Sequence, residues 1–332
     1  MLWIEKYRPR RFEEMAGQAE VKTYLSSFSS EGSVPHMLFF GPHGTGKSVA
    51  MECLARRLYG DSWTENTSII DTALLFGQGK SYLENEEKFS HLYQKSESLI
   101  VNFKHIVKWY ASMRPLNAPF KIIVFENAGA LTFEAQQALR RIMERYSTTC
   151  RFIFISTNQS TIIPAISSRC LPFFFAPLSS ELILERLGRI MVQEGITDAS
   201  VPHEEREIFI QAAQGDLRRA ITYLQLFHEQ AGKTDLAEMS LSETGSVAGS
   251  LFIALESRDL RRAMHLGETL MIEYGLSGRE VVEELRAVAR REYNHPGIAL
   301  ALADTDACLG HAGNEYIQVN ALFARIITEV FA

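Results

Sequence analysis

The segment that most constrains what this chain can fold into is the glycine-rich sequence Gly41-Pro-His-Gly-Thr-Gly-Lys-Ser48, which fits the pattern G-x-x-x-x-G-K-[ST]. A short apolar run, Met37–Phe40, precedes it, and a helical pattern, Val49–Leu58, follows it. A strand, a glycine-rich turn and a helix in this order predict a phosphate-binding loop for a nucleoside triphosphate. The alternative is a chance glycine turn, which the strand and the helix on either side disfavour.

The chemistry of phosphate binding explains these residue types. Glycine has no Cβ, so the backbone N–H groups of the loop can turn inward around phosphate oxygens. Lys47 then reaches the β- and γ-phosphates, and the hydroxyl of Ser48 binds Mg²⁺. The helix that begins here directs its partly positive end at the same anion. The loop residues that we expect at the nucleotide are Gly41, Pro42, His43, Gly44, Thr45, Gly46, Lys47 and Ser48.

Length, composition and net charge restrict the classes of protein to which this chain can belong. The 332 residues suffice for two or three domains of about 100–200 residues. Hydrophobic residues make up 46 % and charged residues 22 %, which is typical of a globular protein with real cores. The net charge of −6 excludes a uniformly basic nucleic-acid binder, so any DNA contact has to come from a local basic stripe.

Cysteine usage and hydropathy indicate the compartment. The four cysteines are scattered without a C-x-x-C pair, which favours reduced thiols over a metal site or disulfides. We expect no signal segment and no membrane span, because no apolar run reaches the ~18 residues that a span needs. The chain is therefore expected inside the cell.

Several motifs outside the loop are similar to those of one family. Trp3-Ile-Glu-Lys-Tyr-Arg-Pro9, then Gly17-Gln18, then Pro35-His36 ahead of the loop, resemble the small subunits of replication factor C, the AAA+ clamp loader of archaea and eukaryotes. The resemblance covers nearly the whole chain except roughly residues 61–100. It implies a doubly wound parallel α/β AAA+ domain at 1–177, a helical lid domain at 178–235 and an all-helical collar domain at 236–332. A linker is expected at Ala231–Ser246, where Gly, Ser, Thr and acids are frequent.

The resemblance also implies roles for single residues. Tyr7 and Arg8 belong to an arm that lies over the adenine in the family; a surface tail is the alternative. Asn158 matches the sensor-one position near the γ-phosphate. Arg169, in Ser-Arg-Cys, matches an arginine that enters the neighbouring subunit's ATP site, and Arg218 matches sensor two on the lid. The alternative for Arg169 is a surface salt bridge, and the alternative for Arg218 is an arginine on the surface of a helix.

One departure from the family decides what the chain's own site can do. The apolar strand Lys121–Phe125 ends in Glu126-Asn127, where the family has Asp-Glu. Glu126 keeps the charge that orients Mg²⁺, on a stem one methylene longer. Asn127 replaces the base, and an amide orients water without accepting its proton. We expect slow hydrolysis here, although some GTPases position water with a neutral Gln. The family's Asn-Ala-Ser-Asp-Glu-Arg-Gly segment is also missing, and 61–100 suggests only a loop and a helix start.

A DNA-facing surface is expected on two helices. Asn102–Ala111 carries Lys104, His105 and Lys108 on or near one face, and Val101–Pro115 contains no acid. In the family this helix meets duplex phosphates; a solvated helical face is the alternative. The basic residues that we expect at DNA are Lys104, Lys108, Arg140, Arg141 and Arg145.

Three functional hypotheses remain open at this point. The first is a clamp-loader small subunit that binds ATP, hydrolyses it poorly and supplies Arg169 to a neighbour. The second is a fully active AAA+ ATPase, and the third is a non-catalytic scaffold that holds partners through the collar. The expected partners are a large subunit, a second small subunit, a ring-shaped sliding clamp and primer–template DNA, with no membrane. The resemblance implies a location in the cytoplasm, in association with the nucleoid, or in the nucleus if the source is a eukaryote.

Overall fold

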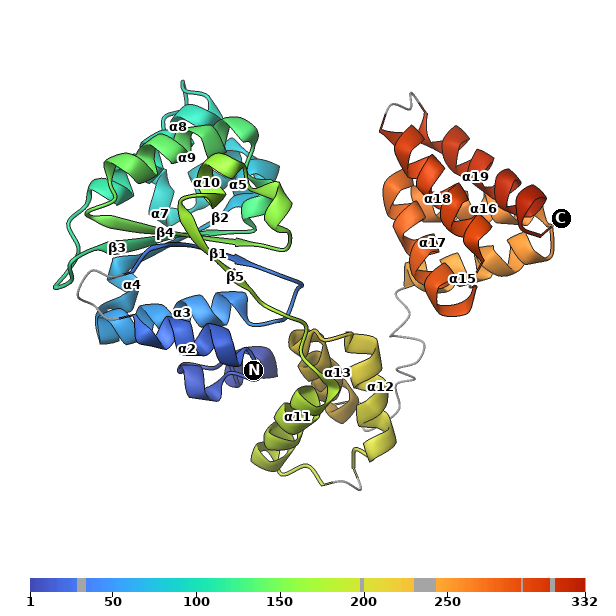
Figure 1. Ribbon diagram of the computed structural model, residues 1–332, viewed down its shortest axis with the longest axis horizontal. Helices are drawn as coiled ribbons and strands as arrows, with labels where there is room; N and C mark the ends of the chain where they lie inside the picture. Colours follow the sequence, from blue (N-terminus) through green and yellow to red (C-terminus); the bar gives the residue numbers. More distant parts are fainter. Residues whose placement is uncertain (29–33, 198–199, 230–242, 294, 311–313, 332) are drawn as a thin grey trace. The chain divides into compact units, whose positions relative to one another are not determined.

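A computed structural model describes residues 1–28, 34–197, 200–229, 243–293, 295–310 and 314–331 (Figure 1). The chain divides into two compact units, Met1–Gly232 and Lys233–Ala332. The N-terminal unit holds the phosphate-binding loop, and the C-terminal unit is helical throughout its described part. None of the helices within the described ranges is long and apolar enough to cross a membrane.

The N-terminal unit is built on a parallel sheet of five strands in the order β2-β3-β4-β1-β5. The central strands are almost wholly apolar because both faces of a parallel sheet are covered. The prediction of a doubly wound parallel sheet is therefore confirmed. The strands are β1 (His36–Phe40), β2 (Thr67–Asp71), β3 (Lys121–Glu126), β4 (Cys150–Ser156) and β5 (Cys170–Phe174).

Helices cover both faces of this sheet (Figure 1). One apolar core lies between the sheet and helices α2 (Ala19–Ser27) and α3 (Lys47–Tyr59). A second core lies on the opposite face, under α5 (Thr72–Gln78), α8 (Leu99–Ser112) and α9 (Phe133–Arg145). The shorter helices on the two faces are α4 (Trp63–Asn66), α6 (Lys80–Asn85), α7 (Glu87–Ser90) and α10 (Pro164–Ser167).

Helix α9 shows how the sequence determines these elements. The hydroxyl of Thr132 accepts from the backbone N–H of Ala135 and caps the first turn. Apolar residues at the spacing of one helical face, from Ala135 through Leu139 to Ile142, are buried against the sheet. The opposite face therefore presents the polar and basic residues of the helix to solvent.

The structure corrects the interpretation of residues 61–100. Strand β2 and helices α5, α6 and α7 occupy the stretch where only a loop and a helix start were expected. Strand β5 was also not predicted. Both are edge strands, so each is paired on one side only and lacks the continuous apolar run of a central strand. In β5, Pro172 further weakens the strand pattern.

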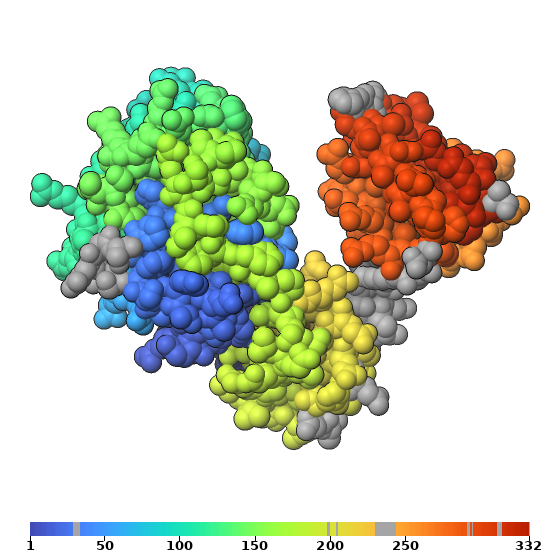
Figure 2. Space-filling view, viewed as in Figure 1, coloured from blue at the N-terminus to red at the C-terminus, as the bar shows by residue number. Residues whose placement is uncertain are grey.

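Three lid helices complete the N-terminal unit: α11 (Ser180–Glu194), α12 (His203–Ala213) and α13 (Leu217–Glu229). The N-terminal arm, with the short helix α1 (Trp3–Lys6), packs on them (Figure 2). The backbone N–H of Trp3 donates to Oε1 of Gln225 at 2.8 Å, and the hydroxyl of Tyr7 donates to Glu194 at 2.5 Å. The arm is thus bound to the lid, not free as a surface tail would be.

The described part of the C-terminal unit is a helical bundle with its own apolar core. Its first helix begins at Glu243, so the expected linker is wrong at its end: Glu243–Ser246 are helical. The rest of that linker, up to residue 242, lies outside the described residues. The helices are α15 (Glu243–Glu256), α16 (Leu260–Ile272), α17 (Gly278–Glu292), α18 (Pro296–Leu309) and α19 (Glu315–Glu329).

Candidate nucleotide-binding site and basic groove

The glycine-rich loop connects β1 to α3, as the sequence predicts. Gly41, Gly44 and Gly46 all have positive φ, at 139°, 66° and 97°. Space is also limiting, because a Cβ on Gly41 would lie 2.2 Å from the carbonyl oxygen of Phe175. A Cβ on Gly44 would lie 1.6 Å from Oδ1 of Asp216, at the start of the lid helix α13. Glycine is therefore required at position 41 by the close approach of the chain after β5, and at position 44 by the close approach of the lid.

Lys47 is the first residue of α3 and lies against its own loop. Its ammonium donates to the carbonyl oxygens of Gly41 at 2.6 Å and Pro42 at 2.5 Å. Burial lowers the pKa of Lys47 to about 8, with Asp216 opposing and Arg218 adding to that shift. The loop thus holds a partly desolvated cation at the point where the sequence predicts phosphate binding.

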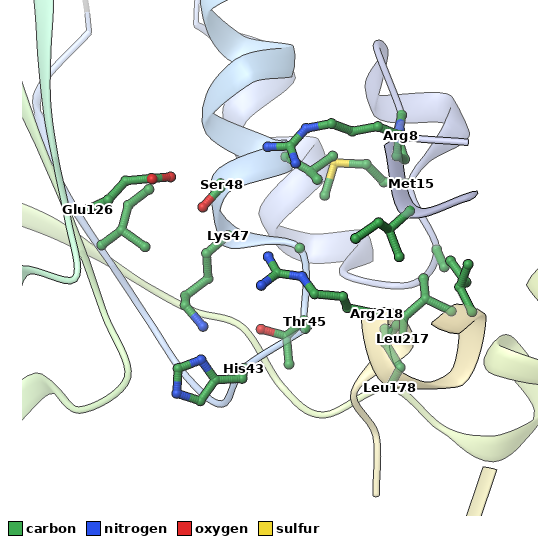
Figure 3. Close-up of a pocket in the computed structure, with 18 of the residues that line it drawn as sticks. Arg8, Met15, His43, Thr45, Lys47, Ser48, Glu126, Leu178, Leu217 and Arg218 are labelled. Carbon is green, nitrogen blue, oxygen red and sulfur yellow. The ribbon is translucent and has the colours of Figure 1, made fainter. Parts of the chain in front are cut away.

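A cavity of about 460 Å³ opens over the loop (Figure 3). Most of the residues predicted for the nucleotide line it. Those residues are Tyr7, Arg8, His43, Gly44, Thr45, Gly46, Lys47, Ser48, Glu126, Asn127 and Arg218. They come from the arm, the loop, the end of β3 and the lid, so four separate parts of the N-terminal unit meet at this site.

The polyphosphate end of the cavity offers ligands for a metal ion. The carboxylate of Glu126 and the hydroxyl of Ser48 point toward one another (Figure 3). Mg²⁺ prefers oxygen ligands and is commonly held by one or two protein groups together with substrate phosphates. No cluster of three or more His, Cys, Asp or Glu side chains forms an all-protein metal cage within the described part of the chain. The residues present therefore fit a nucleotide-bound Mg²⁺.

The opposite wall suits a nucleoside. Apolar side chains from the arm and the lid line it, namely Ile4, Met15, Leu178, Leu217 and Ile221. Arg8 stays fixed by an ion pair with Glu52 at 2.5 Å. Arg186, which the sequence analysis did not identify, also lines the cavity and donates to the carbonyl oxygen of Tyr7 at 2.6 Å. No motif marks Arg186; only its place on a lid helix beside the arm brings it here.

A second residue missed from the sequence is Asp71, the last residue of β2. It lines the cavity and sits at the position of β2 that pairs with Glu126 of β3. Asn127 has a left-handed backbone, with φ of 51°, and its amide donates to both carboxylate oxygens of Asp71 at 3.2 Å. A sequence pattern could have identified it, because Asp71 directly follows Ile69 and Ile70. An acid after a short apolar run is typical of the carboxyl end of a strand, where parallel sheets bind their ligands.

Four of the predicted residues lie outside the set that lines the cavity. Gly41 and Pro42 contribute the carbonyl groups that hold Lys47. Asn158 is exposed, and its backbone bonds with the hydroxyl of Ser156. Its role as a sensor stays a prediction.

Arg169 is the fourth residue outside the cavity, and its side chain is 33 % exposed. It donates to the carbonyl oxygen of Ala165 at 2.7 Å and to Glu144 at 2.6 Å. The guanidinium lowers the pKa of Glu144. These bonds hold Arg169 away from the chain's own nucleotide cavity.

The predicted basic residues form a groove between α8 and α9. Lys104, Lys108, Arg141 and Arg145 line a hollow of about 420 Å³, in which Lys104 pairs with Glu134 at 3.3 Å. Two residues depart from the expectation. Arg140 lies outside the groove lining, 3.6 Å from Glu144. His105 also lies outside that lining, with its Nδ1 3.3 Å from the carbonyl oxygen of Leu92.

Comparison with known proteins identifies the family. The chain is 32 % identical to the replication factor C small subunit of Archaeoglobus fulgidus, over 98 % of this chain and 97 % of that protein. The chain belongs to the replication factor C small-subunit family. It is 34 % identical to the family member from Methanoculleus marisnigri, over 98 % of this chain and 96 % of that protein. A family model described as "DNA polymerase III, delta subunit" matches residues 17–179.

Solved structures of other proteins resemble this chain in fold. The structure of the Aeropyrum pernix ORC1 protein in complex with DNA has a TM-score of 0.55 at 15 % identity, covering 96 % of this chain and 84 % of that one. A point mutant of Thermotoga maritima RuvB has a TM-score of 0.50 at 13 % identity, covering 84 % of this chain and 85 % of that one. The fold is that of AAA+ proteins, a parallel sheet with helices on both faces followed by a helical C-terminal region.

Proposed function

We propose that this chain is a small subunit of an ATP-dependent clamp loader, which places a ring-shaped sliding clamp on primer–template DNA during replication. The observation that carries the proposal is the meeting of Lys47, Ser48 and Glu126 in one cavity of a replication factor C small-subunit relative. Its partners are a large subunit, a second small subunit, the sliding clamp and DNA.

Within this function the cavity binds ATP with Mg²⁺. Lys47 and Arg218 supply positive charge for the phosphates, and Ser48 and Glu126 hold the metal ion, which supplies charge neutralisation at the phosphates. The apolar wall between arm and lid receives the adenine. Because residues of the arm, loop and lid all touch one ligand, ATP binding fixes the lid against the AAA+ core.

Hydrolysis at this site is slow in our proposal. The side chain at position 127, where the family carries its base, is an amide with no proton affinity near neutral pH. General-base catalysis contributes roughly 10²–10⁴-fold to such reactions. The site therefore binds ATP well and turns it over poorly.

Arg169 serves a neighbouring subunit. Its guanidinium lies outside the cavity of its own chain, is partly exposed, and is held in place by Ala165 and Glu144. A planar, permanently charged group of this kind binds the γ-phosphate oxygens of ATP through paired donors. The neighbour's hydrolysis, more than this chain's own, then depends on Arg169.

DNA binds at the groove between α8 and α9, weakly in the isolated subunit and appreciably only in the assembled loader. The four basic residues of the groove are clustered, whereas the whole chain carries a net charge of −6. Phosphate contacts of this kind position the protein on a duplex without reading its sequence.

The experiment that tests the proposal is ATP binding by the full chain. We expect Lys47→Ala to weaken the Kd for Mg-ATP by roughly 10–150-fold, the effect of losing a charge-assisted hydrogen bond of about 1.5–3 kcal/mol. Lys80→Ala, which removes an exposed lysine outside the cavity, is the matched control and leaves the Kd unchanged. Equal affinity of Lys47→Ala and the parent would overturn ATP binding at this loop.

A further inference from the structure

The amide of Asn127 has a carboxylate partner that the phosphate-loop motifs do not include. We propose that the residual ATP hydrolysis of this chain runs through Asp71, which accepts the proton of the attacking water while Asn127 orients that water. The inference rests on the proposed function, because it requires ATP in the cavity. It assigns to two side chains, on neighbouring strands, the work that a single glutamate would do.

The arrangement of the two strand ends carries this inference. Asp71 and Glu126 are paired positions at the ends of the parallel strands β2 and β3, and Asn127 is the next residue. Asp71, Glu126 and Asn127 all line the nucleotide cavity. The left-handed backbone of Asn127 places its amide 3.2 Å from both oxygens of Asp71. The carboxylate of Asp71 therefore lies beside Asn127, the position at which the family carries its catalytic base.

The hydrogen bonds determine what each side chain can still do. An amide that donates through nitrogen keeps its oxygen as an acceptor, and that oxygen can hold one hydrogen of a water molecule. The carboxylate of Asp71 has about four acceptor positions. Its Oδ1 accepts from Asn127 and from two backbone N–H groups, whereas among the described residues its Oδ2 accepts from Asn127, so Oδ2 keeps an acceptor position for a hydrogen of that water. Asn127 thus has the capacity to orient water, and Asp71 has the capacity to take its proton.

Asp71 is also held rigidly. Its Oδ1 accepts from the backbone N–H groups of Ala73 at 2.9 Å and Leu74 at 3.2 Å, which caps helix α5. The first turn of the helix therefore fixes the carboxylate before nucleotide binds. A fixed acceptor loses no orientation energy when the reaction begins.

Two other acids line the cavity, and both have different positions. Those acids are Glu5 and Glu126. Glu5 lies on the arm, 3.7 Å from Arg8, at the nucleoside end. Glu126 faces Ser48 and is assigned to Mg²⁺ (Figure 3). Among the described residues around the cavity, Asp71 is the carboxylate that remains for the water.

The proposed step balances in atoms and charge. The oxygen of water forms a bond to the γ-phosphorus, and the bond from that phosphorus to the bridging oxygen breaks, its electron pair leaving with ADP. The O–H bond of the water breaks, and its proton goes to a carboxylate oxygen of Asp71. That proton then passes to the released phosphate, which restores the carboxylate.

The test is single-turnover hydrolysis of ATP by the full chain in excess over nucleotide, together with the Kd for Mg-ATP and the melting temperature. Asp71→Asn keeps the helix cap and an acceptor for Asn127, because asparagine caps helices about as well as aspartate. It removes only the carboxylate. We expect a rate loss of roughly 10²-fold, a Kd within about twofold of the parent, and an unchanged melting temperature.

Three further variants separate catalysis from structure. Asp61→Asn removes an exposed acid outside the cavity and keeps the parent's rate. Asp71→Glu keeps a carboxylate and retains part of the rate. The exchange Asp71→Asn/Asn127→Asp returns an acid to the pair and raises the rate above that of Asp71→Asn. Aspartate suits position 127 because it tolerates a left-handed backbone.

The outcomes distinguish this inference from the function on which it rests. If Asp71→Asn hydrolyses ATP at the parent's rate with its Kd intact, the inference is wrong and ATP binding stands. A parent chain that binds Mg-ATP but hydrolyses it no faster than Lys47→Ala overturns the inference in the same way. A parent chain that fails to bind Mg-ATP overturns the proposed function instead.

Discussion

At the scale of single residues, Lys47 is subject to two opposing demands. Phosphate binding needs its positive charge, yet burial lowers the pKa of its ammonium to about 8. Its hydrogen bonds to Gly41 and Pro42 compensate for part of the lost water. A lysine with an ordinary pKa would stay charged across the physiological pH range, whereas Lys47, with a pKa of about 8, loses its proton at mildly alkaline pH.

This pKa predicts a pH dependence of ATP affinity. Bound phosphate groups favour the charged ammonium, so the pKa of Lys47 is higher with ATP than without it. Binding therefore takes up a proton between the two pKa values. The affinity is fully present below pH 8 and falls by up to about tenfold for each pH unit above it, until the bound-state pKa is reached.

Isothermal calorimetry from pH 7.5 to about 9.5, in buffers of different ionisation enthalpy, measures both the Kd and the proton uptake. Lys47→Ala serves as the control, because its weaker binding should lack this dependence. A parent Kd that stays constant over the same range would contradict the assignment of the titration to Lys47.

The sequence identified most of the residues around Lys47 because they lie in local motifs. Gly41 to Ser48 form a motif between a strand and a helix, and Glu126-Asn127 and Arg218 were identified by their resemblance to motifs of the family. Asp71 and Arg186 carry no such motif. Asp71 reaches the site because β2 pairs with β3, and Arg186 because a lid helix packs on the arm. Tertiary pairing between distant segments is not encoded in a local pattern.

At the scale of elements, the same distinction applies to the fold. Central strands such as β1 and β3 are covered on both faces, so their sequences are continuous apolar runs and were predicted. The edge strands β2 and β5 have a neighbour on one side only and mix polar residues or proline into the run. The helical character of the C-terminal region was expected from the resemblance to the family, and the described part of that region is helical.

The groove between α8 and α9 gives a prediction at this scale. Loss of a phosphate contact reduces the slope of log affinity against log salt by about 0.9. We expect Lys104→Ala/Lys108→Ala to lower both the DNA affinity and the salt slope of the assembled loader, measured by fluorescence anisotropy. Lys80→Ala/Lys95→Ala removes two lysines that do not line the groove and leaves both unchanged. Unchanged affinity and slope for the groove variant would exclude this surface as the DNA contact.

Helix packing in the C-terminal unit gives a second prediction. Gly267 of α16 lies so close to Phe323 of α19 that an added Cβ would be 2.6 Å from the ring. At Gly249 of α15, no atom of the described residues lies within 4 Å of an added Cβ, apart from the backbone of its own helix and its chain neighbours. We expect Gly267→Ala to destabilise the unit by about 1–3 kcal/mol through overpacking. Gly249→Ala should stabilise it by roughly 0.5–1 kcal/mol, because alanine restricts the unfolded chain.

Denaturant unfolding of the full chain, followed by circular dichroism, measures the two glycine variants. The pair is matched because each adds one methyl group to a helix interior of the same unit. Equal effects of the two substitutions would show that α16 and α19 tolerate a wider separation than the contact with Phe323 indicates.

At the scale of the whole molecule, the nucleotide cavity and Arg169 of this chain are proposed to serve two different ATP sites. In the proposed function its cavity binds ATP but has an amide in place of the base, whereas Arg169 is held outside that cavity. In an assembly, such a subunit contributes more to its neighbour's hydrolysis than to the total through its own site. If Arg169 acts as the proposed arginine finger, its contribution to the neighbour's reaction is on the order of 10³–10⁵-fold.

The most direct test is steady-state ATP turnover by the loader reconstituted with its other subunits, with clamp and primer–template DNA present. We predict that Arg169→Ala sharply reduces turnover and clamp loading, through a site that this chain does not own. Asn127→Ala should change total turnover little, because slow hydrolysis at its own site contributes little. A large loss from Asn127→Ala together with no loss from Arg169→Ala would contradict the account, because catalysis would then run through this chain's own site.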